Sequence, residues 1–116
     1  MLKVHARKLD DVTVLCLEGQ IISGDTEILR SSVQLASDDI ILDFSNVSIV
    51  DAHGLGVLLQ LRAQTLAKGV HFELRNMSKA LYRIFEITRL NTVFAINSGV
   101  EFYPQVSYRQ RLPVAA

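Results

Sequence analysis

The chain has 116 residues, 49% of them hydrophobic, and its 12 basic and 12 acidic residues give a formal net charge of zero. This length fits one domain with a core that needs no staple. A neutral chain is a poor candidate for a general nucleic-acid binder, so we expect no nucleic-acid partner. The single cysteine, Cys16, lies in an apolar run and excludes a disulfide framework, so we expect a small core residue.

Neither a signal peptide nor a membrane-spanning helix is expected from the sequence. The first residues are charged, and no apolar run approaches the roughly 20 residues that cross a bilayer. The lone thiol also favours a reducing compartment. We therefore expect a cytoplasmic protein with no membrane insertion.

Two strands and a helix are predicted in the first third of the chain. Residues 2–7 alternate between apolar and polar, as in a half-buried strand. Residues 12–18 predict a second, more buried strand, close enough to form a hairpin through a turn at residues 10–11. Asp25 is a suitable N-cap for a helix that runs to about Ala36.

The middle of the chain contains a buried strand followed by a helix. Residues 40–44 are typical of a strand that is buried on both faces. A polar loop is expected next, and then a helix that continues from about Gly54 to Ala67, with Gly69 as its stop signal. Four leucines recur at helical spacing in this segment, namely Leu55, Leu58, Leu59 and Leu66.

The last part of the pattern predicts a strand, a helix and a short strand. Residues 70–75 alternate, Ser78 is a suitable N-cap, and residues 92–96 favour a strand. The order β-β-α-β-α-β-α-β contains three βαβ units, which imply parallel pairing with right-handed crossovers beside an antiparallel edge. We expect an α/β fold in which a small mixed β-sheet packs against helices.

The most informative segment is the turn before the second helix. Helix N-termini favour negative charge, because their free N–H groups and the macrodipole are directed there. An aspartate can cap these groups, and glycines allow close approach of the helix to its surroundings or of a partner to the backbone. A dinucleotide site is not expected, since the third glycine and a downstream acid are missing. The turn reads Asp51-Ala52-His53-Gly54-Leu55-Gly56.

This turn and its flanking segments resemble the STAS domain family, the bacterial anti-sigma factor antagonists. The similarity covers roughly residues 2–96, so we expect a STAS-like domain at residues 1–96 and a C-terminal extension at residues 97–116. The extension lacks the final amphipathic helix of many family members. The matching segments are Ile40-Ile41-Leu42-Asp43-Phe44, Val50-Asp51, Gly54-Leu55-Gly56-Val57-Leu58-Leu59, Leu17-Glu18-Gly19, and Phe72-Glu73-Leu74-Arg75-Asn76 with Ser78.

The resemblance implies a partner-switching role without catalysis. In this family, an ATPase of the serine-kinase class binds and inhibits a sigma factor, and the unphosphorylated STAS protein binds the ATPase instead. The ATPase then phosphorylates a Ser or Thr directly after the aspartate, and the added charge separates the complex. The implied partner is therefore an anti-sigma factor of the serine-kinase class, and no cofactor or metal is implied.

The sequence departs from the family at the phosphorylated position. Ala52 follows Asp51 and has no hydroxyl group, and His53 occupies the next position, which is often serine. We expect no phosphorylation at the usual position and an antagonist that stays in its binding-competent form. The residues expected to contact the partner are Asp51, Ala52, His53, Gly54, Leu55 and Gly56.

Several alternatives remain open at this point. The chain could be a STAS subunit of a larger complex, such as a stressosome-like assembly or a lipid-transport ABC system, or a nucleotide-binding sensor. His53 could accept a phosphoryl group, and Ser45 and Ser48 in the expected loop are alternative phosphorylation sites. A homodimer is possible, with Tyr103 and Tyr108 of the extension as contacts.

Charged residues outside the turn are unevenly distributed. Residues 1–51 hold nine acidic and four basic residues, whereas residues 52–116 hold three and eight. This bipolar pattern suits electrostatic docking of a partner, or reflects two solvated faces. The basic residues around the third helix are Arg75, Lys79, Arg83 and Arg89.

Polar residues on the predicted strands give no metal site. His5 and His71 fall on polar phases of their strands, without further ligands at a suitable spacing. Asp43 interrupts a buried strand and needs partners, either at a wet edge or in support of the Asp51 loop.

Overall fold

The computed structural model describes residues 1–97. The predicted order of strands and helices is confirmed, with one short 3₁₀ helix, η1, added before the last strand. The elements are β1 (Lys3–Leu9), β2 (Val12–Ile21), α1 (Glu27–Leu35), β3 (Asp39–Val50), α2 (Ala52–Ala67), β4 (Phe72–Arg75), α3 (Lys79–Ile87), η1 (Leu90–Thr92) and β5 (Ala95–Asn97).

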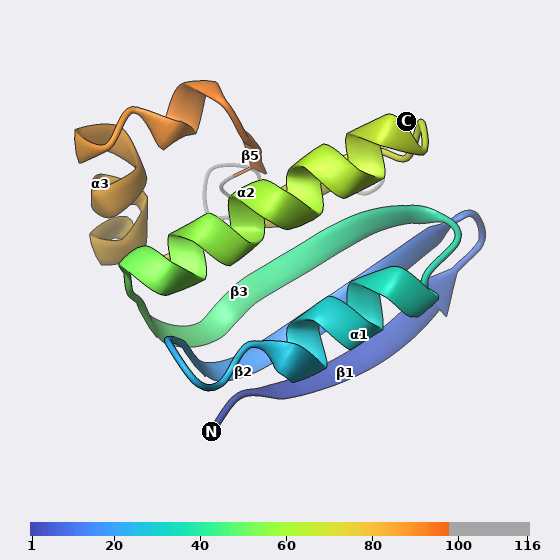
Figure 1. The fold of residues 1–116 in the computed structure, drawn as a ribbon, viewed down its shortest axis with the longest axis horizontal. Coiled ribbons are helices and arrows are strands. Elements are labelled where there is room, and N and C mark those ends of the chain that lie inside the picture. Colours follow the sequence, from blue (N-terminus) through green and yellow to red (C-terminus); the bar gives the residue numbers. More distant parts are fainter. Residues whose placement is uncertain (98–116) are drawn as a thin grey trace.

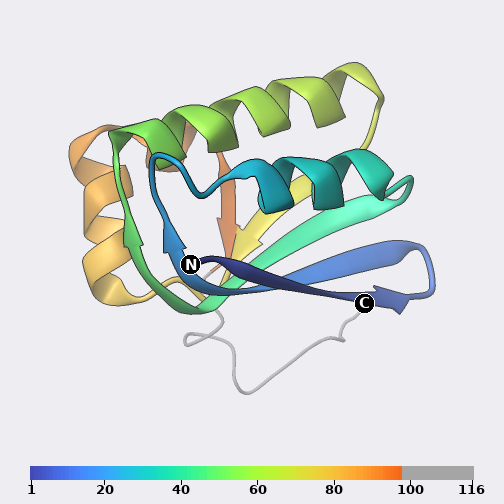
Figure 2. The ribbon, with the colours of Figure 1, turned by 60° about the horizontal axis from the view of Figure 1, so that its bottom comes forward.

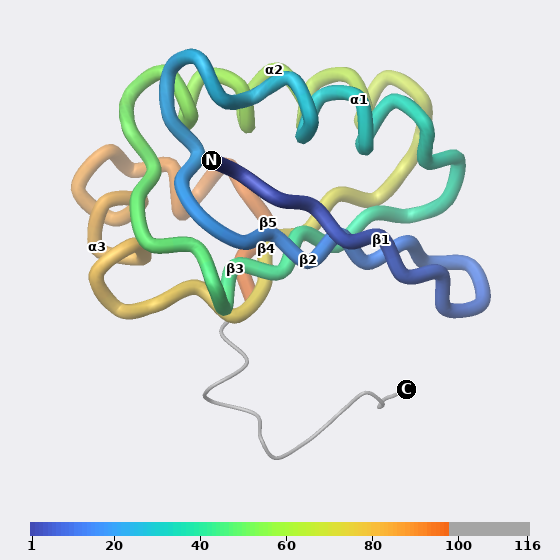
Figure 3. Tube along the Cα trace, turned by 90° about the horizontal axis from the view of Figure 1, so that it is seen from below, coloured from blue at the N-terminus to red at the C-terminus, as the bar shows by residue number. Residues whose placement is uncertain are grey.

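The five strands form one mixed sheet in sequence order, β1-β2-β3-β4-β5. β1 and β2 are antiparallel, and the other neighbours are parallel. Helices α1 and α2 lie together on one face of the sheet, and α3 stands at the end where α2 begins (Figures 1, 2 and 3). This is the α/β architecture expected from the sequence.

The core lies between the sheet and its helices. Leu15, Leu42 and Leu74 come from three neighbouring strands and are completely or almost completely buried. Leu58 and Leu61 of α2 are also fully buried in the same hydrophobic cluster. The burial of these large apolar side chains, each contributing about 1.5–3 kcal/mol, fixes the position of α2 on the sheet.

The first helix begins later than the sequence predicts. Its N-cap is Thr26, whose side chain makes no capping hydrogen bond, and α1 starts at Glu27. Asp25 lies outside the helix, where its carboxylate forms an ion pair with the N-terminal amine of Met1 at 3.5 Å. The assignment of Asp25 as the N-cap was therefore wrong, because an ion pair with a distant residue leaves no sequence signal.

The expected polar loop after Phe44 is also wrong, because β3 continues to Val50. β2 runs on to Ile21 and supplies the partner for this second half of β3. The register shifts twice near Gly19, whose φ is +119°. These irregularities break the simple alternation of burial, so the polar residues of β3 look like a loop in the sequence.

The last strand is displaced from its predicted position. Residues 90–92 form η1 and β5 begins at Ala95, so Thr92 belongs to a helical turn. Phe94 precedes the strand and is buried against Phe85 of α3, with ring centroids 5.7 Å apart and an edge-to-face orientation. Packing of the aromatic pair therefore sets the entry into β5.

Gly69 ends α2 as predicted. It has a φ of +73° and follows the C-cap Lys68, so it provides the left-handed turn that terminates many helices. Tyr103 and Tyr108, named above as possible dimer contacts, lie outside the described residues. Across residues 1–97, no helix is long and apolar enough to cross a membrane.

Candidate functional site

Asp51 connects two segments of the chain at the start of α2. One carboxylate oxygen accepts a hydrogen bond from the Gly54 amide at 2.7 Å, which is an N-cap bond. The other oxygen accepts from the Ser23 amide at 3.0 Å, in the loop between β2 and α1. These bonds from Gly54 and Ser23 hold the pKa of Asp51 below its usual value. The carboxylate is therefore a fixed anionic anchor.

The contact with Ser23 extends the predicted site. The Asp51 amide also donates to the carbonyl of Ile21 at 3.2 Å, so the end of β2 and the start of α2 are joined on both sides of Asp51. The capping role is readable from the sequence, whereas the bond to Ser23 spans 28 residues and depends on the parallel pairing of β2 with β3. No local signal marks Ser23.

The two glycines of the turn have different surroundings. Gly54 is buried, and a Cβ atom there would overlap the backbone carbonyl oxygen of Ile21. Gly56 is half-buried, and a Cβ atom there would meet nothing within 4 Å. Of these two positions, only 54 therefore requires glycine. At position 56, the absence of a side chain leaves the backbone of α2 accessible on its outer side.

Ala52 and His53 are both exposed at the N-terminus of α2. Leu55 is half-buried and packs against the core. The structure thus separates the six predicted contact residues. Ala52, His53 and Gly56 offer surface to a partner, whereas Gly54 lies inside.

An apolar stripe continues from Ala52 along the outer side of α2. Residues spaced three and four apart lie on one face of a helix. Of the four leucines at helical spacing, Leu58 is buried, whereas Leu59 is 37% and Leu66 is 63% exposed. We call the outward face the α2 stripe, and it consists of Ala52, Gly56, Leu59, Ala63 and Leu66.

The hydroxyl groups of Ser45 and Ser48 on β3 have structural roles. Ser45 donates to the carboxylate of Asp43, and its amide donates to the same oxygen at 2.9 Å. Asn76 donates to this oxygen at 3.3 Å, so Asp43 joins β3 to the residue after β4. Ser48 donates to the carbonyl of Gly19 at 3.3 Å. Asp43 is therefore bonded to its own strand and to Asn76, and none of its bonds reaches Asp51.

The predicted basic cluster is divided by the fold. Lys79, Arg83 and Arg89 are exposed on and after α3, at the end of the molecule where α2 begins (Figure 1). Arg75 instead makes two contacts with the Glu73 carboxylate on β4, at 2.9 and 2.7 Å. The α3 residues give positive charge beside the turn, and Arg75 belongs to the sheet.

His71 also pairs with Glu73, with 3.3 Å between Nε2 and Oε1. The hydrogen bond to Glu73 raises the pKa of His71. Burial alone would raise the pKa of Glu73, but its bonds with His71 and Arg75 hold that pKa below the usual value. Within residues 1–97, no group of three or more His, Cys, Asp or Glu side chains is arranged to hold a metal ion.

The comparison with known families agrees with this architecture. The model of the STAS domain matches residues 3–107, which is most of the chain. The chain belongs to the STAS domain family. The resemblance inferred from the turn and its flanking strands is thereby confirmed, and the match continues beyond residue 96.

Solved structures with this fold include anti-sigma factor antagonists. A Mycobacterium paratuberculosis anti-sigma factor antagonist has a TM-score of 0.73 and 21% identity, over 84% of this chain and 86% of that one. The Bacillus cell fate determinant SpoIIAA in its phosphorylated form has a TM-score of 0.62 and 21% identity, over 81% and 90%. A Wolinella succinogenes sulfate transporter family protein has a TM-score of 0.68 and 17% identity, over 77% and 78%. At these identities the similarity establishes the fold.

Proposed function

We propose that this STAS protein is an anti-sigma factor antagonist without phosphorylation control at the usual position. Its partner is an anti-sigma factor of the serine-kinase ATPase class in the cytoplasm, and the protein itself is not an enzyme. The observation that carries the proposal is the exposed Ala52, which follows the capping Asp51 and offers no hydroxyl group.

The proposed contact surface combines the turn with the α2 stripe. Ala52 and His53 are exposed at the start of the helix, the half-buried Gly56 adds no side chain there, and Leu59 adds an apolar contact one turn further. Exposed apolar residues in a continuous row mark a binding surface more often than scattered ones do. Asp51 and Gly54 fix the geometry of this surface through their contacts with Ser23 and Ile21.

Several features argue for binding instead of chemistry. Both oxygens of the Asp51 carboxylate accept backbone hydrogen bonds, which leaves Asp51 a poor general base. The hydroxyl groups of Ser45 and Ser48 donate hydrogen bonds within the sheet, to Asp43 and to the Gly19 carbonyl, and thereby stabilise β3. His53 is exposed at the N-terminus of α2.

The experiment is a pull-down with the tagged full chain from a lysate of the native organism, with and without ATP, followed by mass spectrometry. We expect a kinase-like ATPase that remains bound in ATP, with no phosphate on the bait. Recovery of transporter or stressosome subunits without such an ATPase would contradict the proposed partner. A phosphate on His53, Ser45 or Ser48 that coincides with release would contradict the expectation of a bait without phosphate and would place the control at another residue.

A further inference from the structure

Strand β1 forms an open edge of the sheet. Among the described residues, β2 is its one neighbour in the strand order. In an antiparallel pair, every second residue directs its N–H and C=O groups away from the partner strand. The outer side of β1 therefore presents backbone donors and acceptors to which a further strand can bind. Six of its seven residues are exposed.

The charge of this edge has one sign. β1 contains Lys3, Arg7 and Lys8, three of the four Lys and Arg residues in the first 51 positions, and no acidic residue. Lys8 is paired with Asp38 at 3.0 Å. Within residues 1–97, no carboxylate lies at ion-pair distance from Lys3 or Arg7. Lys3 lies opposite Glu18 in the β1–β2 register, whereas Arg7 lies opposite Val14 and has no acidic neighbour across the pair. The outer strand itself is therefore basic, in a half of the chain that is otherwise acidic.

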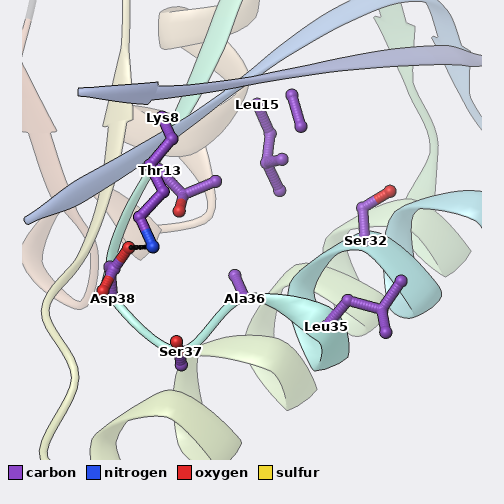
Figure 4. A pocket seen from close by; sticks show the side chains of 9 residues that line it. Lys8, Thr13, Leu15, Ser32, Leu35, Ala36, Ser37 and Asp38 are labelled. Carbon is purple, nitrogen blue, oxygen red and sulfur yellow. Dashed lines mark ion pairs between the residues drawn. The ribbon is translucent and has the colours of Figure 1, made fainter. Parts of the chain in front are cut away.

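A pocket of about 320 Å³ opens beside the same edge (Figure 4). Ala6 and Lys8 of β1, with Thr13 and Leu15 of β2, line its sheet side. The end of α1 lines the opposite side, where Leu35 is 86% exposed. α1 ends at this residue and leaves the inner face of β1 uncovered beyond Val4, which is half-buried against the core.

A second copy of the chain is a poor occupant of this edge. Two copies of β1 paired antiparallel about His5 would place Lys3 of each copy opposite Arg7 of the other. Like charges directly opposite in a sheet are destabilising. Basic residues on an edge strand protect against self-association in this way, but they attract a strand of opposite charge.

We propose that the β1 edge docks an extended acidic segment of a partner protein as an additional strand. Its backbone pairs with β1, and its acidic side chains lie beside Lys3 and Arg7 on the face away from α1. An apolar side chain of the alternate phase enters the pocket between Leu15 and Leu35. This mode of recognition takes affinity from main-chain bonds and specificity from alternate side chains. The site is separate from the α2 stripe.

The test uses the isotope-labelled full chain and two synthetic peptides, Glu-Val-Glu-Leu-Glu-Val-Glu and its counterpart with Lys in place of Glu. We expect the acidic peptide to bind, with NMR shift changes at residues 3–9 and around the pocket, and the lysine peptide not to bind. Lys3→Glu with Arg7→Glu should lower the affinity for the acidic peptide at least about tenfold and allow the lysine peptide to bind. Ala6→Phe should fill the pocket and lower the affinity for the acidic peptide several-fold.

The matched control is Lys79→Glu with Arg83→Glu on α3, which makes the same change in net charge at another place and should leave acidic-peptide affinity unchanged. The reversed preference expected of the β1 variant cannot arise from unfolding. Equal binding of both peptides, no binding of the acidic peptide, or shift changes confined to α2 would overturn the proposal. A dimer seen by sedimentation that dissociates when β1 is altered would overturn it in favour of a second copy.

Discussion

Gly54 and Gly56 differ in what surrounds them, although the sequence presents them as a pair. Gly54 meets the carbonyl of Ile21 at the joint between β2 and α2, and Gly56 faces open space. The sequence analysis allowed either role for both residues, contact with the fold or approach of a partner. The two glycines can be distinguished only in the folded structure, because Ile21 lies more than 30 residues before Gly54 in the chain.

Alanine substitutions at the two glycines should therefore have opposite effects on stability. Gly54→Ala should lower the free energy of unfolding by about 1–3 kcal/mol, because the new Cβ forces backbone apart. Gly56→Ala should raise it by up to about 1 kcal/mol, since alanine is the better helix former in open space. Urea denaturation of both variants measures the difference. Equal destabilisation would show that the helix packs differently at its start.

The Asp51 cap should depend on pH in a defined direction. Its pKa is lowered by the bonds from Gly54 and Ser23, so its contribution is present above the unfolded pKa of about 3.8. This contribution is lost as the pH falls through the lower folded value. Asp51→Ala should therefore be less stable than the parent at neutral pH, with the difference shrinking in strong acid. Thermal unfolding across this range tests it, with Asp51→Asn as the variant that keeps a capping side chain.

The secondary elements show how far local pattern predicts this fold. The helices and the order of strands follow from apolar spacing and from caps such as Ser78, which accepts from the Leu81 amide at 3.1 Å. The second half of β3 could not be read, because its partner is a bulged extension of β2 with a shifted register. The exposed side of α2 could also not be predicted, because apolar residues occur on both its buried and its exposed sides.

The His71–Glu73 pair should add a pH-dependent contribution to the free energy of unfolding. The bond to Glu73 raises the pKa of His71, so its contribution is fully present below the unfolded pKa of about 6.5 and is lost as the pH rises through the folded value. The destabilisation caused by His71→Gln should accordingly be larger at mildly acidic than at alkaline pH. Chemical denaturation at both pH values measures it. His5→Gln on β1 is the control, and an equal pH effect in both variants would contradict the assignment.

At the scale of the whole molecule, residues 1–97 present three candidate binding surfaces. The α2 stripe and the turn at Ala52 are largely exposed on the helical layer, and the cations of α3 are exposed as well. α3 stands at the end where α2 begins, and β1 is the edge strand of the sheet (Figures 1 and 2). Separate surfaces allow a partner at α2 and an acidic strand at β1 to bind independently. Sequence analysis located the turn through its glycines and aspartate, but the edge depends on strand order.

The measurement that tests the central claim most directly is binding of the purified ATPase partner to the parent chain, Ala52→Ser and Ala52→Asp, with ATP present. We expect the parent to stay bound without phosphate, Ala52→Ser to be phosphorylated and released, and Ala52→Asp to bind at least about tenfold more weakly, because charge enters the interface. Release of the unaltered parent by ATP, or equal affinity of the parent and Ala52→Asp, would contradict the account.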